Sequence, residues 1–211
     1  MPNPILFYFD FASPYGYLAS QRIDAFAARF ARTVDWRAIL IGPAMKETGA
    51  QPQTAVPLRA AYAREDLPRL AKLWGIKFTE PPGMPIFALQ AGRAFWWAHE
   101  AEGPDAARRL ALALYAAHFG RGEDIASADG VLDVAESAGF ARDAVAAGLG
   151  DPAVKERLKE ESAASLRRGV FGSPWFVMDA QNFWGVDRLY VMEEILKRQM
   201  APEGDRGPAG M

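Results

Sequence analysis

The amino-terminal segment combines a strand-like run, a helix-like run and a second strand-like run. Residues 4–9 are aromatic and β-branched, and the run stops at Asp10, a pattern typical of a buried strand. After Ser13 and Pro14, apolar residues recur at helical spacing, which predicts a helix with Ser13 as its N-cap. Residues 33–41 predict a second buried strand. A strand, a helix and a strand within about 40 residues indicate a parallel, right-handed crossover, the start of an α/β fold.

The middle of the chain, residues 44–168, changes to alanine-rich helical patterns. Short segments rich in Gly and Pro separate these patterns and are able to end helices. The apolar spacing predicts helices at residues 56–75, 88–102, 105–119, 127–138 and 151–168. We therefore expect an all-helical domain inserted into the sheet.

The chain then returns to strand-like patterns. Residues 175–178 predict a short strand, 179–182 a turn and 183–184 the returning strand of an antiparallel hairpin, before a closing helix at 187–200. The last residues are rich in Gly and Pro without apolar periodicity. The predicted organisation is a discontinuous α/β domain at 1–43 and 169–200, a helical insertion domain at 44–168 and a disordered tail at 201–211.

The composition fits a globular protein and argues against several partners. Half of the 211 residues are hydrophobic, enough for a sizeable core. The 24 basic and 26 acidic residues give a net charge of −2 and no long run of like charge, so we expect no nucleic acid partner. No apolar run approaches the roughly 20 residues that span a bilayer, and the N-terminus lacks a signal-peptide pattern. We expect a cytoplasmic protein with no membrane partner.

Cysteine and histidine counts narrow the chemistry. The chain has no cysteine and two histidines. These counts exclude disulfides and a cysteine nucleophile, and they leave too few ligands for most zinc sites, so we expect no metal. Any thiol chemistry would have to use a sulfur atom supplied by a ligand.

Ser13 lies between the first strand and the first helix, where a thioredoxin-like protein carries its Cys-x-x-Cys motif. Exposed N–H groups at a helix start favour an anion, and a hydroxyl there could donate a hydrogen bond to a ligand thiolate. The alternative is that Ser13 only caps the helix, a role worth about 1 kcal/mol. This segment alone leaves both interpretations open.

Residues 169–174, Gly-Val-Phe-Gly-Ser-Pro, directly precede the predicted hairpin. A cis bond between Ser173 and Pro174 would turn the Ser173 backbone amide and carbonyl outward, where they could pair with the main chain of a peptide such as glutathione. The alternative is an ordinary turn proline at the start of an edge strand. Further on, Asp187 begins the last predicted helix, where it either caps that helix or accepts the ammonium of a γ-glutamyl group.

Together, residues 9–19, 169–174 and 183–189 resemble the 2-hydroxychromene-2-carboxylate isomerase family, whose relatives are the kappa-class glutathione transferases and the DsbA-like thioredoxin proteins. The resemblance covers the chain from about residue 5 to residue 199, with three motifs in the right order around a helical stretch. It implies a thioredoxin-like fold with a large helical insertion, glutathione as the cofactor, a small-molecule substrate and a homodimer.

The resemblance also implies roles for individual residues. Ser13 matches the serine that hydrogen-bonds the glutathione sulfur, and Ser173 and Pro174 match the cis-proline clamp. The γ-glutamyl end would be held by the segment Trp184, Gly185, Val186 and Asp187. Isomerases of this family are thought to add the glutathione thiolate to a conjugated carbonyl, permit rotation about the former double bond and expel the thiolate again. This mechanism suits a chain without its own sulfur nucleophile.

The sequence departs from the family where the acceptor substrate would bind. Gln53 and Thr54 stand where the naphthalene-pathway isomerases have an Asn-Arg pair, and their pocket tyrosine falls near Ile86. Lys46 matches their pocket lysine, so one cation is predicted to meet a carboxylate or polarise a carbonyl, although a lone lysine is more often merely solvated. The hydroxychromene substrate is therefore not implied.

The predicted function is a glutathione-dependent isomerase for an unsaturated aromatic-derived carbonyl or carboxylate. One alternative is a kappa-like glutathione transferase, which would use Ser13 in the same way and release a conjugate. Another is a glutathione- or peptide-binding module that kept the fold without turnover. A dithiol–disulfide oxidoreductase is excluded because it needs cysteines.

Overall fold

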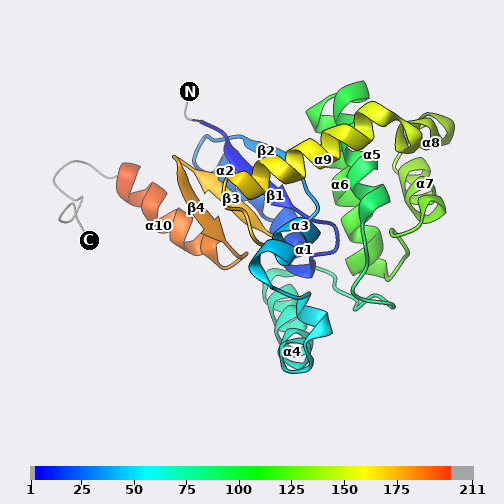
Figure 1. The fold of residues 1–211 in the computed structure, drawn as a ribbon. Helices are drawn as coiled ribbons and strands as arrows, with labels where there is room; N and C mark the ends of the chain where they lie inside the picture. Colours follow the sequence, from blue (N-terminus) through cyan, green and yellow to red (C-terminus); the bar gives the residue numbers. More distant parts are fainter. Residues whose placement is uncertain (1–2, 201–211) are drawn as a thin grey trace.

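A mixed four-stranded sheet forms the centre of the computed structural model, which describes residues 3–200 (Figure 1). Its strands run in the order β2-β1-β3-β4. β1 pairs in parallel with β2, while β1 with β3 and β3 with β4 are antiparallel. The strands span Ile5–Phe9 (β1), Val34–Ala38 (β2), Trp175–Met178 (β3) and Gln181–Trp184 (β4). The predicted crossover and hairpin are both confirmed, and the second strand of the hairpin begins two residues earlier than expected.

β1 is central because its side chains are apolar on both faces. Phe7 and Phe9 are fully buried and stack at 5.1 Å between ring centroids. Phe7 also stacks on Phe176 of β3 at 5.4 Å and meets Trp36 of β2 edge-on at 4.9 Å. Tyr8, which points to the opposite face, is also buried. β1 is thus covered on both faces, as suits a central strand, and it pairs with one strand from each end of the chain.

Helices occupy most of the remaining chain. Their bounds are α1 Pro14–Ser20, α2 Ile23–Ala28, α3 Gly42–Thr48, α4 Pro57–Trp74, α5 Leu89–Glu102, α6 Pro104–Tyr115, α7 Ala128–Ser137, α8 Arg142–Gly150, α9 Pro152–Arg167 and α10 Arg188–Met200, with a short 3₁₀ turn, η1, at Gln53–Ala55 and a π-turn, η2, at Ala116–Gly120. Every predicted helix is present. α3, α8 and η1 were not predicted, and the first predicted helix is divided into α1 and α2.

Two of these differences have local physical reasons. The chain leaves the helical conformation at Arg22, whose φ is −126° and whose amide bonds three residues back to Ala19. In α8, Gly148 suggests a turn but lies in a helix, where it allows close packing: a Cβ at this position would lie 2.1 Å from the Trp97 ring. Packing against a tryptophan is not visible in a local sequence pattern.

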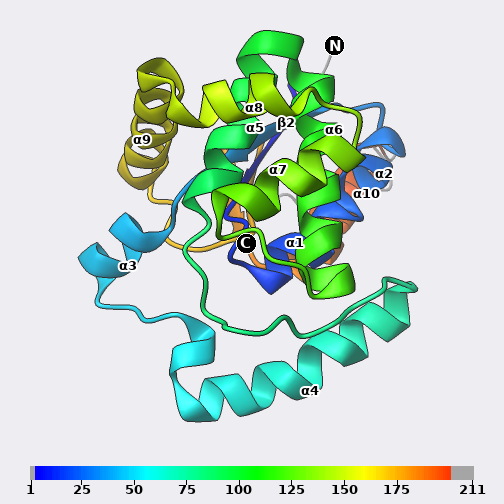
Figure 2. The ribbon, with the colours of Figure 1, turned by 90° about the vertical axis from the view of Figure 1, so that its right-hand side faces the viewer.

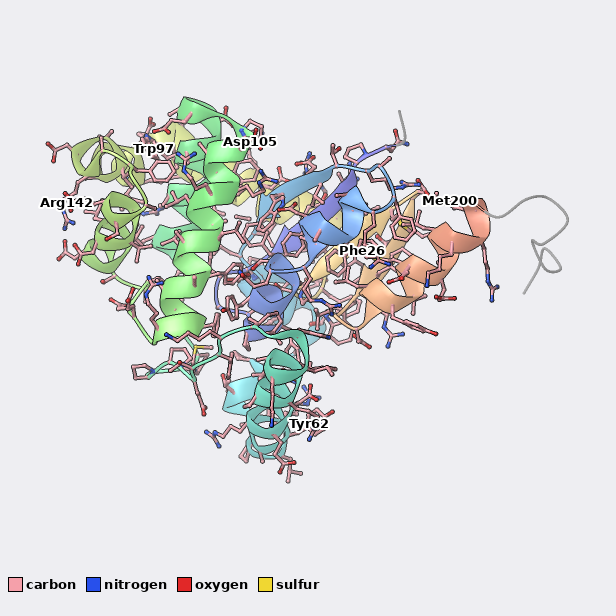
Figure 3. All side chains as sticks on the ribbon, turned by 180° about the vertical axis from the view of Figure 1, so that it is seen from behind. Phe26, Tyr62, Trp97, Asp105, Arg142 and Met200 are labelled. Atoms are coloured by element: carbon pink, nitrogen blue, oxygen red, sulfur yellow. The ribbon has the colours of Figure 1, made fainter. Side chains whose placement is uncertain are left out.

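The helices are distributed unevenly around the sheet. Helices α5–α8 gather at one side and α10 lies at the other (Figure 1). α4 lies apart from both groups, and the segment 75–88 runs between it and the rest of the protein (Figure 2). Tyr62 of α4 is exposed at the far end of the molecule (Figure 3).

One continuous apolar core connects the sheet with the helices inserted between β2 and β3. It includes Phe9 of β1, Phe95 of α5 and Leu114 of α6, all fully buried. The division into a sheet domain and an insertion at residues 43/44 and 168/169 stays a prediction, and the tail predicted at 201–211 lies outside the described residues. Within residues 3–200, no helix combines the length and apolar character that crossing a bilayer requires.

Candidate functional site

Ser13 and Ser173 meet at the end of β1, although 160 positions separate them in the chain. The Ser13 side chain caps α1 by accepting a hydrogen bond from the Gly16 amide at 3.0 Å, as predicted. Its hydroxyl donates to the Ser173 carbonyl at 2.8 Å. The Ser13 hydroxyl therefore does more than cap a helix: it joins the two predicted motifs. α1 has only seven residues, so the hydroxyl, rather than a long helix dipole, is the feature to consider.

The bond between Ser173 and Pro174 is cis, as expected. The orientation of Ser173 differs in one respect from the prediction, because its carbonyl is occupied by the Ser13 hydroxyl. The Ser173 hydroxyl faces the other way and accepts a hydrogen bond from the Asp10 amide at 3.0 Å. Both polar ends of Ser173 are thus anchored to the segment that carries Ser13.

Asp10, predicted only as the end of a strand, organises this segment. Its buried carboxylate accepts hydrogen bonds from the amides of Ala12 at 2.9 Å and Ile41 at 2.8 Å. Burial raises the pKa of Asp10 above its ordinary value, and the two backbone donors partly oppose this shift. A carboxylate directly after a buried strand was the available signal, because a polar group there needs partners.

Tyr115 of α6 contacts the segment that carries Ser13. Its hydroxyl donates to the Asp10 carbonyl at 2.8 Å, and burial raises its pKa well above the ordinary value. Gly16 fits between these groups: a Cβ at this position would lie 2.5 Å from the Tyr115 hydroxyl and 3.0 Å from the Ser173 hydroxyl. No sequence motif marks Tyr115, because α6 reads as an ordinary amphipathic helix.

The third predicted motif lies beside Pro174. The Gly185 amide donates to the Pro174 carbonyl at 3.0 Å, and Val186 is buried. Trp184 is half exposed and packs edge-on against Phe171 at 4.7 Å. The Asp187 carboxylate is exposed and pairs with Arg188 at 2.8 Å. The segment 184–187 is therefore adjacent to the Ser173–Pro174 turn.

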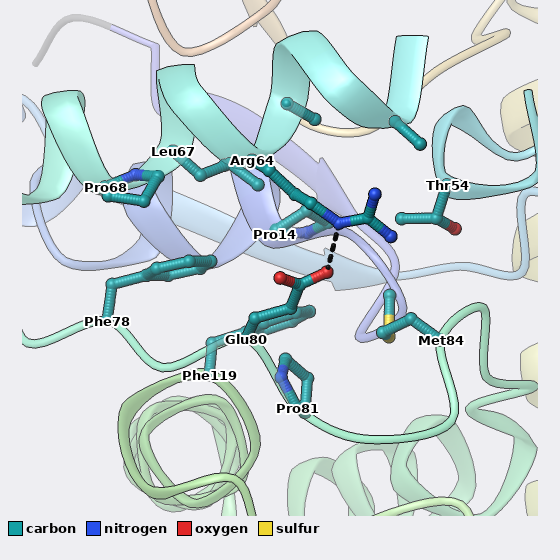
Figure 4. A pocket seen from close by; sticks show the side chains of 12 residues that line it. Pro14, Thr54, Arg64, Leu67, Pro68, Phe78, Glu80, Pro81, Met84 and Phe119 are labelled. Carbon is teal, nitrogen blue, oxygen red and sulfur yellow. Dashed lines mark hydrogen bonds and ion pairs between the residues drawn. The ribbon is translucent and has the colours of Figure 1, made fainter. Parts of the chain in front are cut away.

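A cleft opens next to Ser13, between α4 and the segment 75–88 (Figure 4). It has a volume of about 170 Å³, and Pro14 forms part of its wall. The other lining residues are mostly apolar: Thr54, Ala60, Ala63, Arg64, Leu67, Pro68, Phe78, Glu80, Pro81, Met84 and Phe119. Arg64 and Glu80 form an ion pair across it at 3.1 Å. No sequence motif marks either residue.

The residues expected to bind the acceptor substrate do not all line the cleft. Thr54 lines the cleft, Gln53 is exposed in η1 and Ile86 is half-buried in the segment 75–88. Lys46 is exposed on α3 and is not among the described residues that line the cleft. Its predicted contact with substrate stays a prediction.

Tyr15 connects the Ser13 segment to the wall of the cleft. Its hydroxyl donates to the Asp66 carboxylate of α4 at 3.0 Å. Burial, followed by the nearby Asp66 charge, raises the pKa of Tyr15 above its ordinary value. The phenol therefore stays protonated at neutral pH and acts as a fixed donor that holds α4 against α1.

Comparison with known proteins agrees with this geometry. Residues 4–197 match the family described as DSBA-like thioredoxin domain. The chain is 30% identical to 2-hydroxychromene-2-carboxylate isomerase from Pseudomonas putida, over 94% of this chain and 97% of that protein. It is 28% identical to glutathione S-transferase kappa 1 from Homo sapiens, over 96% and 95%.

A solved structure of a 2-hydroxychromene-2-carboxylate isomerase has the same fold, with a TM-score of 0.81, 28% identity, and coverage of 97% of this chain and 99% of that one. The resemblance inferred from three short motifs is thus confirmed over nearly the whole length. The chain belongs to the DsbA-like thioredoxin family and, within it, to the enzymes related to 2-hydroxychromene-2-carboxylate isomerase and the kappa-class glutathione transferases.

Proposed function

We propose that this protein is a glutathione-dependent isomerase in which Ser13 stabilises the thiolate of bound glutathione. The observation that carries the proposal is the hydroxyl of Ser13, which joins the cis-proline turn at 2.8 Å and lies next to the Pro14 wall of an apolar cleft. The chain has no cysteine, so a nucleophilic sulfur has to come from a ligand. The relatives named isomerase and glutathione transferase support the same chemistry.

Glutathione binding would exchange one hydrogen bond for two. In the free protein, the Ser13 hydroxyl donates to the Ser173 carbonyl. When glutathione binds, the Ser13 hydroxyl would rotate and donate to the sulfur, which favours the thiolate and lowers its pKa. The Ser173 carbonyl, released by Ser13, would then accept the main-chain N–H of the glutathione cysteine. Ser173 itself stays in place through its bond with Asp10.

The γ-glutamyl end would lie along residues 184–187. The Gly185 amide holds this segment against Pro174, and the exposed Asp187 carboxylate offers a partner for an ammonium group. Arg188 pairs with Asp187 in the free protein, so the ligand ammonium would compete with an exposed ion pair of small strength.

The reaction would conserve atoms and electrons. The thiolate adds to the β-carbon of an unsaturated carbonyl compound, forming a C–S bond while the π electrons move to the carbonyl oxygen. Rotation about the resulting single bond follows. The C–S bond then breaks, the double bond forms again in the other geometry, and glutathione returns unchanged. No oxidant is consumed, and the substrate would occupy the cleft beside Pro14.

The first test is a difference ultraviolet spectrum in the thiolate band on adding glutathione at neutral pH. We expect a thiolate signal for the wild type, and its loss with a roughly hundredfold lower turnover for Ser13→Ala, by analogy with the loss of one oxyanion donor. Ser127 provides a matched control because it caps α7 through the Gly130 amide away from the cleft. Ser127→Ala should retain the signal. If Ser13→Ala also retains it, Ser13 is only a cap and the proposal fails.

A glutathione transferase is the second candidate, because the human kappa relative is nearly as similar as the isomerases. The two reactions differ in their glutathione balance. A transferase consumes one glutathione per product, whereas an isomerase returns it. Glutathione measured at complete conversion separates them, and binding without turnover would indicate a binding module.

We also propose that the protein is a homodimer, as the resemblance to its relatives implies. Sedimentation velocity of the full chain measures this directly. A single species at the mass of one chain, 23.1 kDa, over a wide concentration range would contradict it.

A further inference from the structure

The cleft beside Ser13 is apolar except at one point. Arg64 and Glu80 are the two charged side chains among the described residues that line it. The Arg64 Nε donates to the Glu80 carboxylate at 3.1 Å, and the two residues come from opposite walls, α4 and the segment 75–88 (Figure 4). The pair makes the charge of the lining zero. Glu80 therefore already neutralises the charge of Arg64 before a ligand enters the cleft.

Glu80 is held in this position by its neighbours. The Thr79 amide donates to the Phe119 carbonyl at 2.7 Å, and the Thr79 hydroxyl donates to the Gly120 carbonyl at 3.3 Å. Pro81 follows Glu80 and fixes its own φ. The backbone beside Glu80 is thus anchored to η2, and the ion pair with Arg64 holds the Glu80 carboxylate at the cleft.

Arg64 retains hydrogen-bond donors that Glu80 does not use. The bond to Glu80 involves Nε, and the terminal guanidinium nitrogens make no hydrogen bond to any residue in the range 3–200. In Figure 4 they point along the cleft toward Thr54. A planar guanidinium with free donors suits a carbonyl oxygen.

A ligand carboxylate would be disfavoured at this point. To pair with Arg64, the ligand carboxylate would lie beside the Glu80 carboxylate, and the two negative charges would repel each other. Alternatively it would displace Glu80 from Arg64, at the small cost of breaking a half-exposed ion pair. A neutral carbonyl avoids both costs because it accepts from Arg64 while the ion pair stays intact.

We propose that the cleft binds small, uncharged aromatic compounds with an unsaturated carbonyl, and that Glu80 excludes the corresponding carboxylates. The volume of about 170 Å³ suits one ring with a short chain, since apolar cavities of about 150 Å³ bind benzene. This inference rests on the proposed function because it takes the cleft as the acceptor site of the same enzyme. It narrows the substrate to a neutral carbonyl compound, in contrast to the carboxylate in the name of the isomerase relatives.

The test uses trans-cinnamamide and trans-cinnamate, which have the same shape and differ in charge. Ligand-observed NMR titrations without glutathione compare wild type, Glu80→Gln and Arg64→Gln. The Arg64 side chain is 63% exposed and the Glu80 side chain 53% exposed, so both variants should fold. Thermal unfolding checks this. Glu156→Gln, which breaks the Lys159 pair on α9, is the matched control.

We expect the wild type to bind the amide roughly tenfold more tightly than the carboxylate. Glu80→Gln should remove this preference, Arg64→Gln should weaken amide binding severalfold without restoring the carboxylate, and Glu156→Gln should resemble the wild type. Equal binding of both ligands by the wild type, an unchanged preference in Glu80→Gln, or no binding of either ligand would overturn the proposal. The Ser13-dependent thiolate band, measured separately, shows whether the proposed function fails with it or stands alone.

Discussion

Gly16 is the residue around which the candidate site is packed. A Cβ at this position would lie 2.5 Å from the Tyr115 hydroxyl and 3.2 Å from the Ser13 Cβ. Such a contact requires the neighbours to shift, and the Tyr115 hydroxyl is held by its bond to the Asp10 carbonyl. The position therefore tolerates no side chain without displacing the residues that form the site.

We predict that Gly16→Ala lowers the free energy of unfolding by about 1–3 kcal/mol, as overpacking typically does, and reduces the Ser13-dependent thiolate signal. Urea unfolding and the ultraviolet difference spectrum measure the two effects. Gly42→Ala is the matched control, since nothing lies within 4 Å of the added Cβ and Gly42 also lies in a helix. Equal effects of the two variants would contradict this explanation.

His118 gives the protein a pH dependence that is unrelated to catalysis. Its Nδ1 lies 2.9 Å from the Glu123 carbonyl, which can only accept, so Nδ1 carries the proton. Burial lowers the pKa of His118 below its ordinary 6.5, against the smaller opposing effects of that bond and of Asp124. Below pH 6.5 the unfolded chain therefore binds more protons at this residue than the folded chain.

It follows that His118 destabilises the fold progressively as the pH falls from 6.5 through the lower folded pKa. We predict that the free energy of unfolding of the wild type falls toward that of His118→Asn as the pH is lowered over this range. Urea unfolding at several pH values between 8 and about 5 measures it. A constant difference for His118→Asn would exclude the effect.

At the level of elements, a hydrogen bond from the indole of Trp96 connects α5 to the sheet. Its Nε1 donates to the carbonyl of Ala38, the last residue of β2, at 2.9 Å, and Arg157 of α9 lies 4.4 Å from its ring. Three elements thus meet on one buried side chain.

Trp96→Phe should cost about 1–3 kcal/mol, because it leaves the buried Ala38 carbonyl without this donor and removes part of the packed ring. Trp97→Phe tests the specificity of this effect: its indole makes no hydrogen bond to a residue that the structure describes, so only its packing against Gly148 is lost, and we expect a smaller cost than at Trp96. Calorimetric unfolding compares the two variants. A larger cost at Trp97 would reverse the assignment.

Most elements could be predicted because their apolar periodicity matches their burial. The strand at residues 4–9 and the helix at 88–102 are fully determined by local pattern, and the structure places both within one residue or two. α8 could not be predicted because Gly148 serves a contact with Trp97 rather than a turn. α3 is a short helix, and two turns of helix give little periodicity.

The candidate site was predictable only in part. Ser13, Ser173 and Pro174 lie in short motifs, and the structure brings them together. Tyr115 and Arg64 belong to helices whose patterns look ordinary, and they reach the site through tertiary packing. Sequence reasoning recognises chemistry that is concentrated in motifs and misses chemistry contributed by single residues of distant elements.

At the scale of the whole molecule, the sheet depends on contacts between strands that are far apart in the sequence. The helical region depends instead on contacts between helices that follow each other in the sequence. α5 and α6 follow each other directly and pack together. β1 instead pairs with β3 through contacts such as Phe7 with Phe176. Local contacts form faster because they close shorter loops.

We therefore predict that α5 and α6 gain protection from hydrogen exchange before β1 and β3 during refolding. Pulse labelling with mass spectrometry, read on peptides covering 89–115 and 173–178, measures the order. The Ser13–Ser173 hydrogen bond also joins residues far apart in the chain, 160 positions from each other. Glutathione binding should therefore recover together with the protection of β1 and β3. Simultaneous protection of both regions would indicate a single cooperative step.

The central position of β1 has a consequence for synthesis in the cell. Its second neighbour, β3, begins at Trp175, and a ribosome that adds about 5–20 residues per second needs on the order of ten to thirty seconds to reach it. During that time one edge of a phenylalanine-rich strand has no partner and can pair with other chains. The yield of active enzyme should therefore depend on translation speed and on chaperones that shield nascent chains, more than on the equilibrium stability of the finished protein.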